Sequence, residues 1–350
     1  MRKKGIACVL TLMMSLSLVA CGKKSSNDAE PNNSDSKANF RVSMVTDTGG
    51  INDQSFNQSA WEGLEYLEEK HNIKINYVES VQAADYASNL DKMVDQGGNL
   101  IWGIGFSIAD ALKTAATMNT DRLYGIIDHT YGDDIPNNVV SVMFRSQEAS
   151  FLVGYAAGKT TTTNKVGFVG GIGNSVLDQF EYGYRAGVAY AAKELGKDIS
   201  VSVQYAESFT DAAIAKAIAT KMYSEGCDII FHAAGNAGNG VIEAAKESNK
   251  LVIGADRDQY DLAPQNVLTS ALKRVDEAII LVTEEVINGN DLGGQNLEYG
   301  LTETSVGIPE ENPNMDPAVY KATMEVQDLI MDGTIDVPYN SESFEAFIAE

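Results

Sequence analysis

From Arg41 onward the sequence alternates between short runs of apolar, often β-branched residues and longer segments with helical spacing. The runs end in an acid, a glycine or a polar loop, and a helix-forming segment follows nearly every one. Strands joined by single helices run parallel, because a parallel neighbour needs a crossover connection. Parallel sheets carry helices on both faces. The pattern therefore predicts an α/β protein built from doubly wound parallel sheets.

The alternation runs twice along the chain, with an interruption near residues 144–147. In the first run we expect strands over Arg41–Thr46, Ile75–Glu79, Leu100–Gly105, Leu123–Asp128 and Asn138–Phe144. We expect helices between them over Ser59–His71, Tyr86–Gln96 and Ala109–Met118. In the second run we expect helices over Gln147–Lys159, Gln179–Leu195, Asp211–Glu225, Gly240–Ser248, Val275–Ile287 and Pro317–Met331. We expect strands over Lys165–Val169, Ile199–Tyr205, Asp228–Ala233, Leu251–Ala255 and Val267–Leu272, and a strand-like segment over Tyr299–Val306.

Two such runs predict two lobes, with no convincing repeat in the sequence itself. If the chain crosses between lobes near 144–147, 270–273 and 305–309, the lobes enclose a cleft. The N-terminal lobe would then hold residues 40–145 and about 271–305, and the C-terminal lobe residues 146–270 and about 306–350. This is the arrangement of periplasmic binding proteins.

The first twenty residues have the order of a secretory signal: three cations at positions 2–4, then an apolar run from Ile6 to Val19. The sequence Leu18-Val19-Ala20-Cys21 resembles the lipobox of bacterial lipoproteins, in which the signal is cleaved before a cysteine that carries lipid. Residues 21–39 are polar and read as a flexible tether. We therefore expect a lipid anchor at Cys21 on the extracytoplasmic face of a cell membrane.

The formal net charge is −23, and without the three signal cations 23 basic residues face 49 acidic ones, which makes it −26. Such an acidic chain does not suit nucleic acid, which selects a basic surface. It suits a dispersed, monomeric protein. Cys227 is the one cysteine of the predicted folded part, so we expect no intramolecular disulfide there.

Motifs for common cofactors fail in detail. Gly171 and Gly173 follow a predicted strand, but Val176 stands where a dinucleotide fingerprint needs glycine, and no phosphate-loop lysine motif occurs. The three histidines show no metal-ligand spacing, and no Gly-x-Ser-x-Gly elbow supports a hydrolase triad. We predict neither a metal, nor a cofactor, nor an enzyme.

Polar and aromatic side chains follow the predicted strands at their carboxyl ends, where the ligands of doubly wound sheets bind. Both halves of the chain contribute such residues: Asp47, Phe106, Asp128, the segment Ser208-Phe209-Thr210-Asp211, the segment Gly235-Asn236-Ala237-Gly238, Asp256 and Lys273. Together they predict a polar pocket with aromatic walls.

Each residue of this set also has a purely structural interpretation. Asp47 and Asp128 could cap helices, and Asp53 could belong to a turn. Phe56 and Phe209 could be core aromatics, and Asp256 could pair with Arg257 or Lys273.

The stretch Asp47-Thr48-Gly49-Gly50-Ile51-Asn52-Asp53-Gln54-Ser55-Phe56-Asn57 resembles the opening motif of the basic membrane protein family, the lipoproteins similar to purine nucleoside receptor A. Phe180 to Gly187, Ser208 to Asp211, His232 to Gly240 and Gly254-Ala255-Asp256 resemble its later motifs. The resemblance covers about residues 40–335. It implies a type I periplasmic-binding-protein fold, a purine nucleoside ligand (guanosine, inosine or adenosine) and delivery to the permease of an ABC importer.

The resemblance also implies roles for single residues at the positions where this sequence matches the family's motifs. Phe56 and Phe209 would stack on the base from opposite lobes, and Asn57 and Asp128 would read its edges. Ribose hydroxyls would bind Asp47, Asp256 and Lys273, with a backbone contact at Gly235. Phe106 would line the same pocket.

Two other functions remain open. A binding protein for a sugar or a signalling molecule would use similar acids and aromatic rings. A nucleoside hydrolase would need Asp47 and Asp53 to hold calcium, yet the acids lack the dense ligand run that calcium requires.

Overall fold

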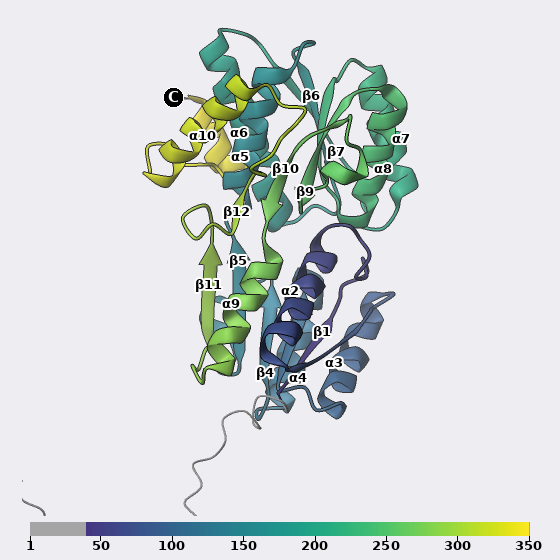
Figure 1. The fold of residues 1–350 in the computed structure, drawn as a ribbon, viewed down its shortest axis with the longest axis vertical. Coiled ribbons are helices and arrows are strands. Elements are labelled where there is room, and N and C mark those ends of the chain that lie inside the picture. Colours follow the sequence, from purple (N-terminus) through teal and green to yellow (C-terminus); the bar gives the residue numbers. More distant parts are fainter. Residues whose placement is uncertain (1–39, 350) are drawn as a thin grey trace, which may run out of the picture.

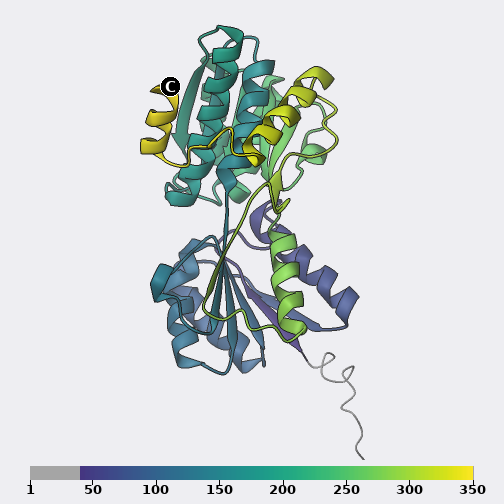
Figure 2. The same ribbon diagram turned by 90° about the vertical axis from the view of Figure 1, so that its left-hand side faces the viewer.

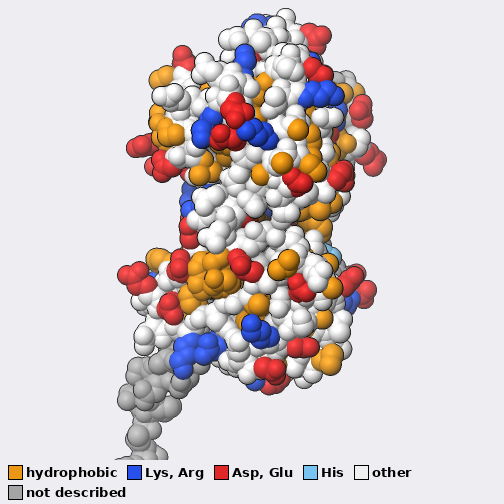
Figure 3. Space-filling model, turned by 90° about the vertical axis from the view of Figure 1, so that its right-hand side faces the viewer, with side chains coloured by type: hydrophobic (Ala, Val, Ile, Leu, Met, Phe, Trp, Pro, Cys, Tyr) orange, Lys and Arg blue, Asp and Glu red, His pale blue; other side chains and the backbone are white. Residues whose placement is uncertain are grey.

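The computed structural model describes residues 40–349, which form two lobes, one above the other (Figure 1). The predicted signal, the tether and Cys21 lie outside the described residues. Within the described part, no helix has both the length and the apolar character needed to span a bilayer. On the face shown in Figure 3, acidic side chains are scattered over both lobes.

The N-terminal lobe is a six-stranded parallel sheet with the order β11-β5-β4-β3-β1-β2. Its strands are β1 (Arg41–Val45), β2 (Lys74–Val78), β3 (Leu100–Ile104), β4 (Leu123–Ile127), β5 (Val139–Phe144) and β11 (Gln295–Tyr299). Its helices are α2 (Phe56–His71), α3 (Tyr86–Asp95), α4 (Ala109–Met118) and α9 (Val275–Ile287). All five residues of the central strand β3 are buried, as expected for a sheet covered on both faces.

The C-terminal lobe repeats this plan with the order β12-β10-β9-β8-β6-β7, except that the short β12 is antiparallel to β10. Its strands are β6 (Lys165–Gly170), β7 (Ser200–Tyr205), β8 (Ile229–Ala233), β9 (Leu251–Asp256), β10 (Val267–Lys273) and β12 (Val306–Gly307). Its helices are α5 (Ser146–Thr160), α6 (Ser175–Leu195), α7 (Ala212–Ser224), α8 (Gly238–Ser248), α10 (Pro317–Met331) and α11 (Ser341–Ala349). The predicted α/β class with two doubly wound sheets is confirmed.

The two sheets correspond strand for strand, so the duplication that the sequence hides is plain in the topology. Short 3₁₀ helices, η2 (Phe106–Ile108) and η4 (Gly235–Ala237), follow the equivalent strands β3 and β8. Asp128 directly follows β4 and Asp256 is the last residue of the equivalent strand β9. Both adopt left-handed backbone, with φ of 65° and 66°. Both halves therefore place an aspartate in the left-handed backbone conformation at the carboxyl end of the equivalent strand.

Within residues 40–349 the chain passes between the lobes three times, and Figure 2 shows these segments at the waist. Arg145 follows β5, Arg274 follows β10, and residues 300–305 link β11 to β12. The Arg145 amide donates to Tyr299 O at 2.7 Å, and the Arg274 amide donates to Ser305 O at 2.9 Å. These bonds tie the third segment to the other two.

The expected strand Tyr299–Val306 is wrong. β11 ends at Tyr299, residues 301–304 form turns, and β12 begins at Val306 in the other sheet. The alternating apolar residues of this stretch belong to two strands and a crossing. The helix α11 was also not expected from the sequence.

Polar side chains start two helices earlier than their apolar periodicity indicates. Asn174 Oδ1 accepts from the Val176 and Leu177 amides, so α6 begins at Ser175 rather than Gln179. Asp53 accepts from the amides of Asn57 and Gln58, so α2 begins at Phe56 rather than Ser59. Both helix starts consequently point at the space between the lobes.

Glycines bring α5 and α6 into close contact. A Cβ at Gly187 would lie 2.0 Å from Phe151 O, and one at Gly183 would lie 2.4 Å from Gln147 O. Most of the motif from Phe180 to Gly187 therefore serves helix packing, and Phe180 is the residue of this motif that lines the cavity between the lobes.

We expect Gly187→Ala to lower the free energy of unfolding by about 1–3 kcal/mol, because the added methyl group forces backbone apart. Helix propensity alone would raise it by about 1 kcal/mol, so denaturant unfolding separates the two effects by sign. Gly173→Ala is the control, since the nearest atom to its Cβ is 3.9 Å away. A stabilised Gly187→Ala variant would contradict the packing argument.

Candidate functional site

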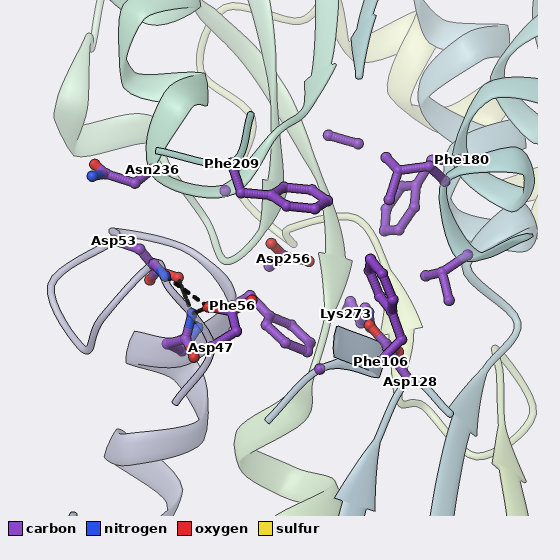
Figure 4. A pocket seen from close by; sticks show the side chains of 17 residues that line it. Asp47, Asp53, Phe56, Phe106, Asp128, Phe180, Phe209, Asn236, Asp256 and Lys273 are labelled. Atoms are coloured by element: carbon purple, nitrogen blue, oxygen red, sulfur yellow. Dashed lines mark hydrogen bonds and ion pairs between the residues drawn. The ribbon is translucent and has the colours of Figure 1, made fainter. Parts of the chain in front are cut away.

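A cavity lies between the lobes at the carboxyl ends of both sheets (Figure 4). The structure brings all nine predicted ligand contacts to its wall: Asp47, Phe56, Asn57, Phe106, Asp128, Phe209, Gly235, Asp256 and Lys273. These residues lie up to 226 positions apart in the sequence, from Asp47 to Lys273. They meet because parallel strands present their carboxyl ends at one edge of the sheet. Their contact with a ligand stays a prediction.

The wall also contains residues that were not predicted as contacts: Gly49, Asp53, Gly105, Val176, Leu177, Phe180, Ala233 and Asn236. Val176, Leu177 and Phe180 lie in the first two turns of α6. Their i, i+1, i+4 spacing is the sequence signal for an apolar helix face, but it does not tell a core from a cleft.

Asp53 organises the loop between β1 and α2. It is 1% exposed, and its carboxylate accepts hydrogen bonds from the amides of Ser55, Asn57 and Gln58. The turn interpretation of Asp53 thus agrees with its hydrogen bonds, although it also lines the cavity. Its role is to hold Phe56 and Asn57 in position.

The amide orientation of Asn57 follows from its partners. Asn57 Nδ2 donates to Asp47 Oδ1 at 2.8 Å and to Asp53 Oδ2 at 3.0 Å. Two carboxylates need donors, so the nitrogen must face them. The buried Oδ1 then has no partner among the described residues, and it can accept a hydrogen bond from a ligand.

Lys273 is the cation of the cavity wall. It is 2% exposed and forms an ion pair with Asp128. Its ammonium also lies 4.6 Å from the ring centroid of Phe56, 5.3 Å from Phe144 and 5.7 Å from Phe180. Rings from both lobes therefore contribute to its electrostatic stabilisation.

The cavity holds more carboxylates than one cation can neutralise. Burial raises the pKa of Asp47 to about 6, against hydrogen bonds from Gly49 and Asn57 that lower it. Burial likewise raises the pKa of Asp256 to about 6, although Lys273 and Ser55 lower it. Asp53 and Asp128 add repulsion in both cases, so the site binds protons more readily than exposed acids do.

Aromatic rings enter the cavity from both lobes. Figure 4 shows Phe56 reaching in from the start of α2 and Phe209 from the opposite lobe, with Phe106 and Phe180 at one side. Phe106 and Phe209 meet edge to face, with ring centroids 6.3 Å apart. Phe56 and Phe209 also pack against the core, so their core interpretation holds for part of each ring.

Contacts between the lobes hold the cavity closed. Ser55 Oγ donates to Asp256 Oδ2, and Gln259 Nε2 donates to Gln54 O at 2.9 Å. At the rim, Arg257 Nη2 lies 2.8 Å from Glu62 Oε1. The suggested pairing of Asp256 with Arg257 is therefore not formed. Asp256 instead serves both the cavity and the contact between lobes.

Within residues 40–349, no group of three or more His, Cys, Asp or Glu side chains has the geometry of a metal site. The carboxylates of the cavity instead point at a space walled by rings. Such a space can accept a flat molecule that supplies hydrogen-bond donors at its edges.

Comparison with known proteins agrees with this geometry. The profile of the PnrA-like ABC transporter substrate-binding proteins matches residues 40–341. The CD4+ T-cell-stimulating antigen of Listeria innocua is 40% identical and covers 97% of this chain and 99% of its own. Basic membrane protein A of Borreliella burgdorferi is 41% identical and covers 98% of each chain.

A solved structure is also similar. The solute-binding protein of an ABC transporter system from Aeropyrum pernix K1 superposes with a TM-score of 0.80 at 26% identity. The superposition covers 89% of this chain and 97% of that one.

We expect the buried Asp256 to make ligand-free stability depend on pH. Its pKa is raised on folding, so its contribution is full below the unfolded pKa of 3.8 and is lost as the pH rises through about 6. Asp256→Asn should therefore lose less stability between pH 4.5 and pH 7 than the unmodified protein, by on the order of 2 kcal/mol. Denaturant unfolding at both pH values measures this difference.

Asp91→Asn, on the exposed face of α3, is the control. If Asp256→Asn and Asp91→Asn change with pH alike, the buried carboxyl titrates as an exposed one and the argument is wrong.

Proposed function

This chain belongs to the PnrA-like family of ABC transporter substrate-binding proteins, and from that premise we propose that it binds purine nucleosides between its lobes and delivers them to the permease of its importer. Members of this family are extracytoplasmic binding proteins rather than enzymes. The finer claims, which are the nucleoside and the lipid anchor, are the proposal.

The facing rings of Phe56 and Phe209 carry the nucleoside proposal. They enter one cavity from opposite lobes, so closure brings them over the two faces of a flat ligand. Stacking on a base contributes about 1–3 kcal/mol per aromatic side chain in other proteins. A purine offers the larger flat surface to both rings.

The hydrogen-bonding groups support a ligand rich in donors. Ionised Asp47, Asp128 and Asp256 can only accept hydrogen bonds, and the free Asn57 Oδ1 also accepts. Asn57 and Asp128 would read base edges, which favours guanosine and inosine because each carries a ring N–H. Adenosine would depend on its exocyclic amine.

The ribose would bind where charge is concentrated. Asp47, Asp256 and Lys273 would bind its hydroxyls, and the backbone at Gly235, whose φ is +52°, would approach the sugar closely. A hydroxyl that donates to a buried carboxylate replaces the water that the carboxylate lost. Removing that partner costs on the order of 1–3 kcal/mol.

The placement of the folded part supports a membrane anchor. β1 begins at Arg41, at the end of the N-terminal lobe away from the cleft (Figure 1). A tether of residues 21–39 from lipidated Cys21 would therefore attach without covering the cavity. We propose that residues 1–20 are the signal and that the protein is monomeric. We also propose that residues 40–145 and about 271–305 form the N-terminal lobe and that residues 146–270 and about 306–350 form the C-terminal lobe.

We expect calorimetric titration of the purified protein to give micromolar or tighter binding for guanosine, inosine or adenosine, and weaker binding for uridine, whose smaller base stacks less. Absence of heat for all four nucleosides would reject the nucleoside proposal. A sugar-binding or signal-binding protein would give that result.

Replacing one stacking ring should weaken every purine nucleoside alike. We expect Phe56→Ala to raise the dissociation constant by about 5–150-fold, the equivalent of 1–3 kcal/mol. Asp256→Asn should instead reduce the preference for ribonucleosides over their 2′-deoxy forms. Tyr66→Ala, an exposed aromatic residue on the same helix, is the control. Unchanged affinity in Phe56→Ala would remove the basis of the stacking argument.

A further inference from the structure

A second cavity adjoins the first between the lobes. We call it the annex. It has a volume of about 410 Å³ and shares Phe106, Asp128 and Val176 with the first cavity. Both lobes line it, through Ser107, Asp110, His129 and Met143 on one side and Asn174 and Ser175 on the other. A volume of this size can hold a substituent of several heavy atoms.

The annex offers polar side chains that form no hydrogen bond with other described residues. Asn174 is engaged in capping α6, and Thr130 Oγ1 donates to Asn296. Among the described residues, no hydrogen bond engages the side chains of Asp110, His129 or Ser175. These groups leave a carboxylate, an imidazole and a hydroxyl facing a space beside the ligand cavity.

The charge of the annex limits what can enter it. Asp110 stands at the first turn of α4, and Asp128 is shared with the first cavity. Lys113 does not line the annex, and its ammonium lies 5.4 Å from the ring centroid of Tyr131. Asp128 is paired with Lys273, so Asp110 is the annex carboxylate that has no ion pair among the described residues. It would repel a phosphate, whereas an amine or a hydroxyl would find an acceptor.

We propose that the annex is a subsite for nucleosides that carry a hydroxyl- or amine-bearing extension, on the base or at the 5′ position, and that it excludes nucleotides. This inference rests on the proposed nucleoside function. It extends the ligand range from simple nucleosides to modified ones, and Phe106, at the junction of both cavities, stands where such an extension would pass.

The test is calorimetry on the full-length protein with adenosine and guanosine. Each is compared with its 5′-amino-5′-deoxy derivative, with a derivative whose exocyclic amine carries an aminobutyl chain, and with its 5′-monophosphate. We expect at least one amine-extended form to bind within tenfold of its parent, and both monophosphates to bind more than a hundredfold more weakly.

Variants locate the extension. Ser175→Trp, at the exposed first residue of α6, should fill the annex, weaken the accepted extended nucleoside at least tenfold and leave its parent within threefold. Asp110→Asn should weaken only the amine-extended form, by about threefold, because an exposed charge pair contributes little. Asp91→Asn is the matched surface control.

The outcomes separate the two proposals. If neither parent nucleoside binds, the proposed function fails and the subsite fails with it. If the parents bind but every extended form binds more than tenfold more weakly than its parent, the subsite alone is wrong. It is also wrong if a monophosphate binds as well as its parent, or if Ser175→Trp affects parent and extended forms equally.

Discussion

Parallel pairing constrains everything else in this protein. Each strand of a parallel sheet needs a crossover, so its carboxyl end opens into a loop, and all such loops collect at one edge. Two sheets with the same strand order face each other across their loop edges. The cavity between them is therefore a consequence of the topology, and residues of these loops line it.

The price of this arrangement is electrostatic. Asp47, Asp128 and Asp256 converge in one cavity, and Lys273 is committed to Asp128. The raised pKa values of Asp47 and Asp256 record the cost of keeping these groups charged. A ligand that donates hydrogen bonds offsets this cost, so the site is less stable empty than filled.

Closure and recognition share residues. Asp256 accepts from Ser55 across the lobes and also lines the cavity, while the rings around the Lys273 ammonium come from both lobes. The crossing segments are joined by backbone bonds beside Arg145 and Arg274. Lys273 directly precedes the crossing at Arg274, so the cation of the cavity wall lies next to a segment that joins the lobes.

The sequence by itself determined the alternation of elements and the fold class, because periodicity is a local property. Strand ends and the family resemblance together indicated nine residues of the cavity wall. The sequence pattern failed at Tyr299–Val306, where one apolar pattern serves two sheets, and at α6, where Asn174 starts the helix early. Only the tertiary structure decided that Asp128 pairs with Lys273, 145 residues away, and that Phe180 faces the cavity. Local pattern shows which side chains are available. Which of them meet depends on how distant strands are ordered in the sheets and how the two lobes close on each other.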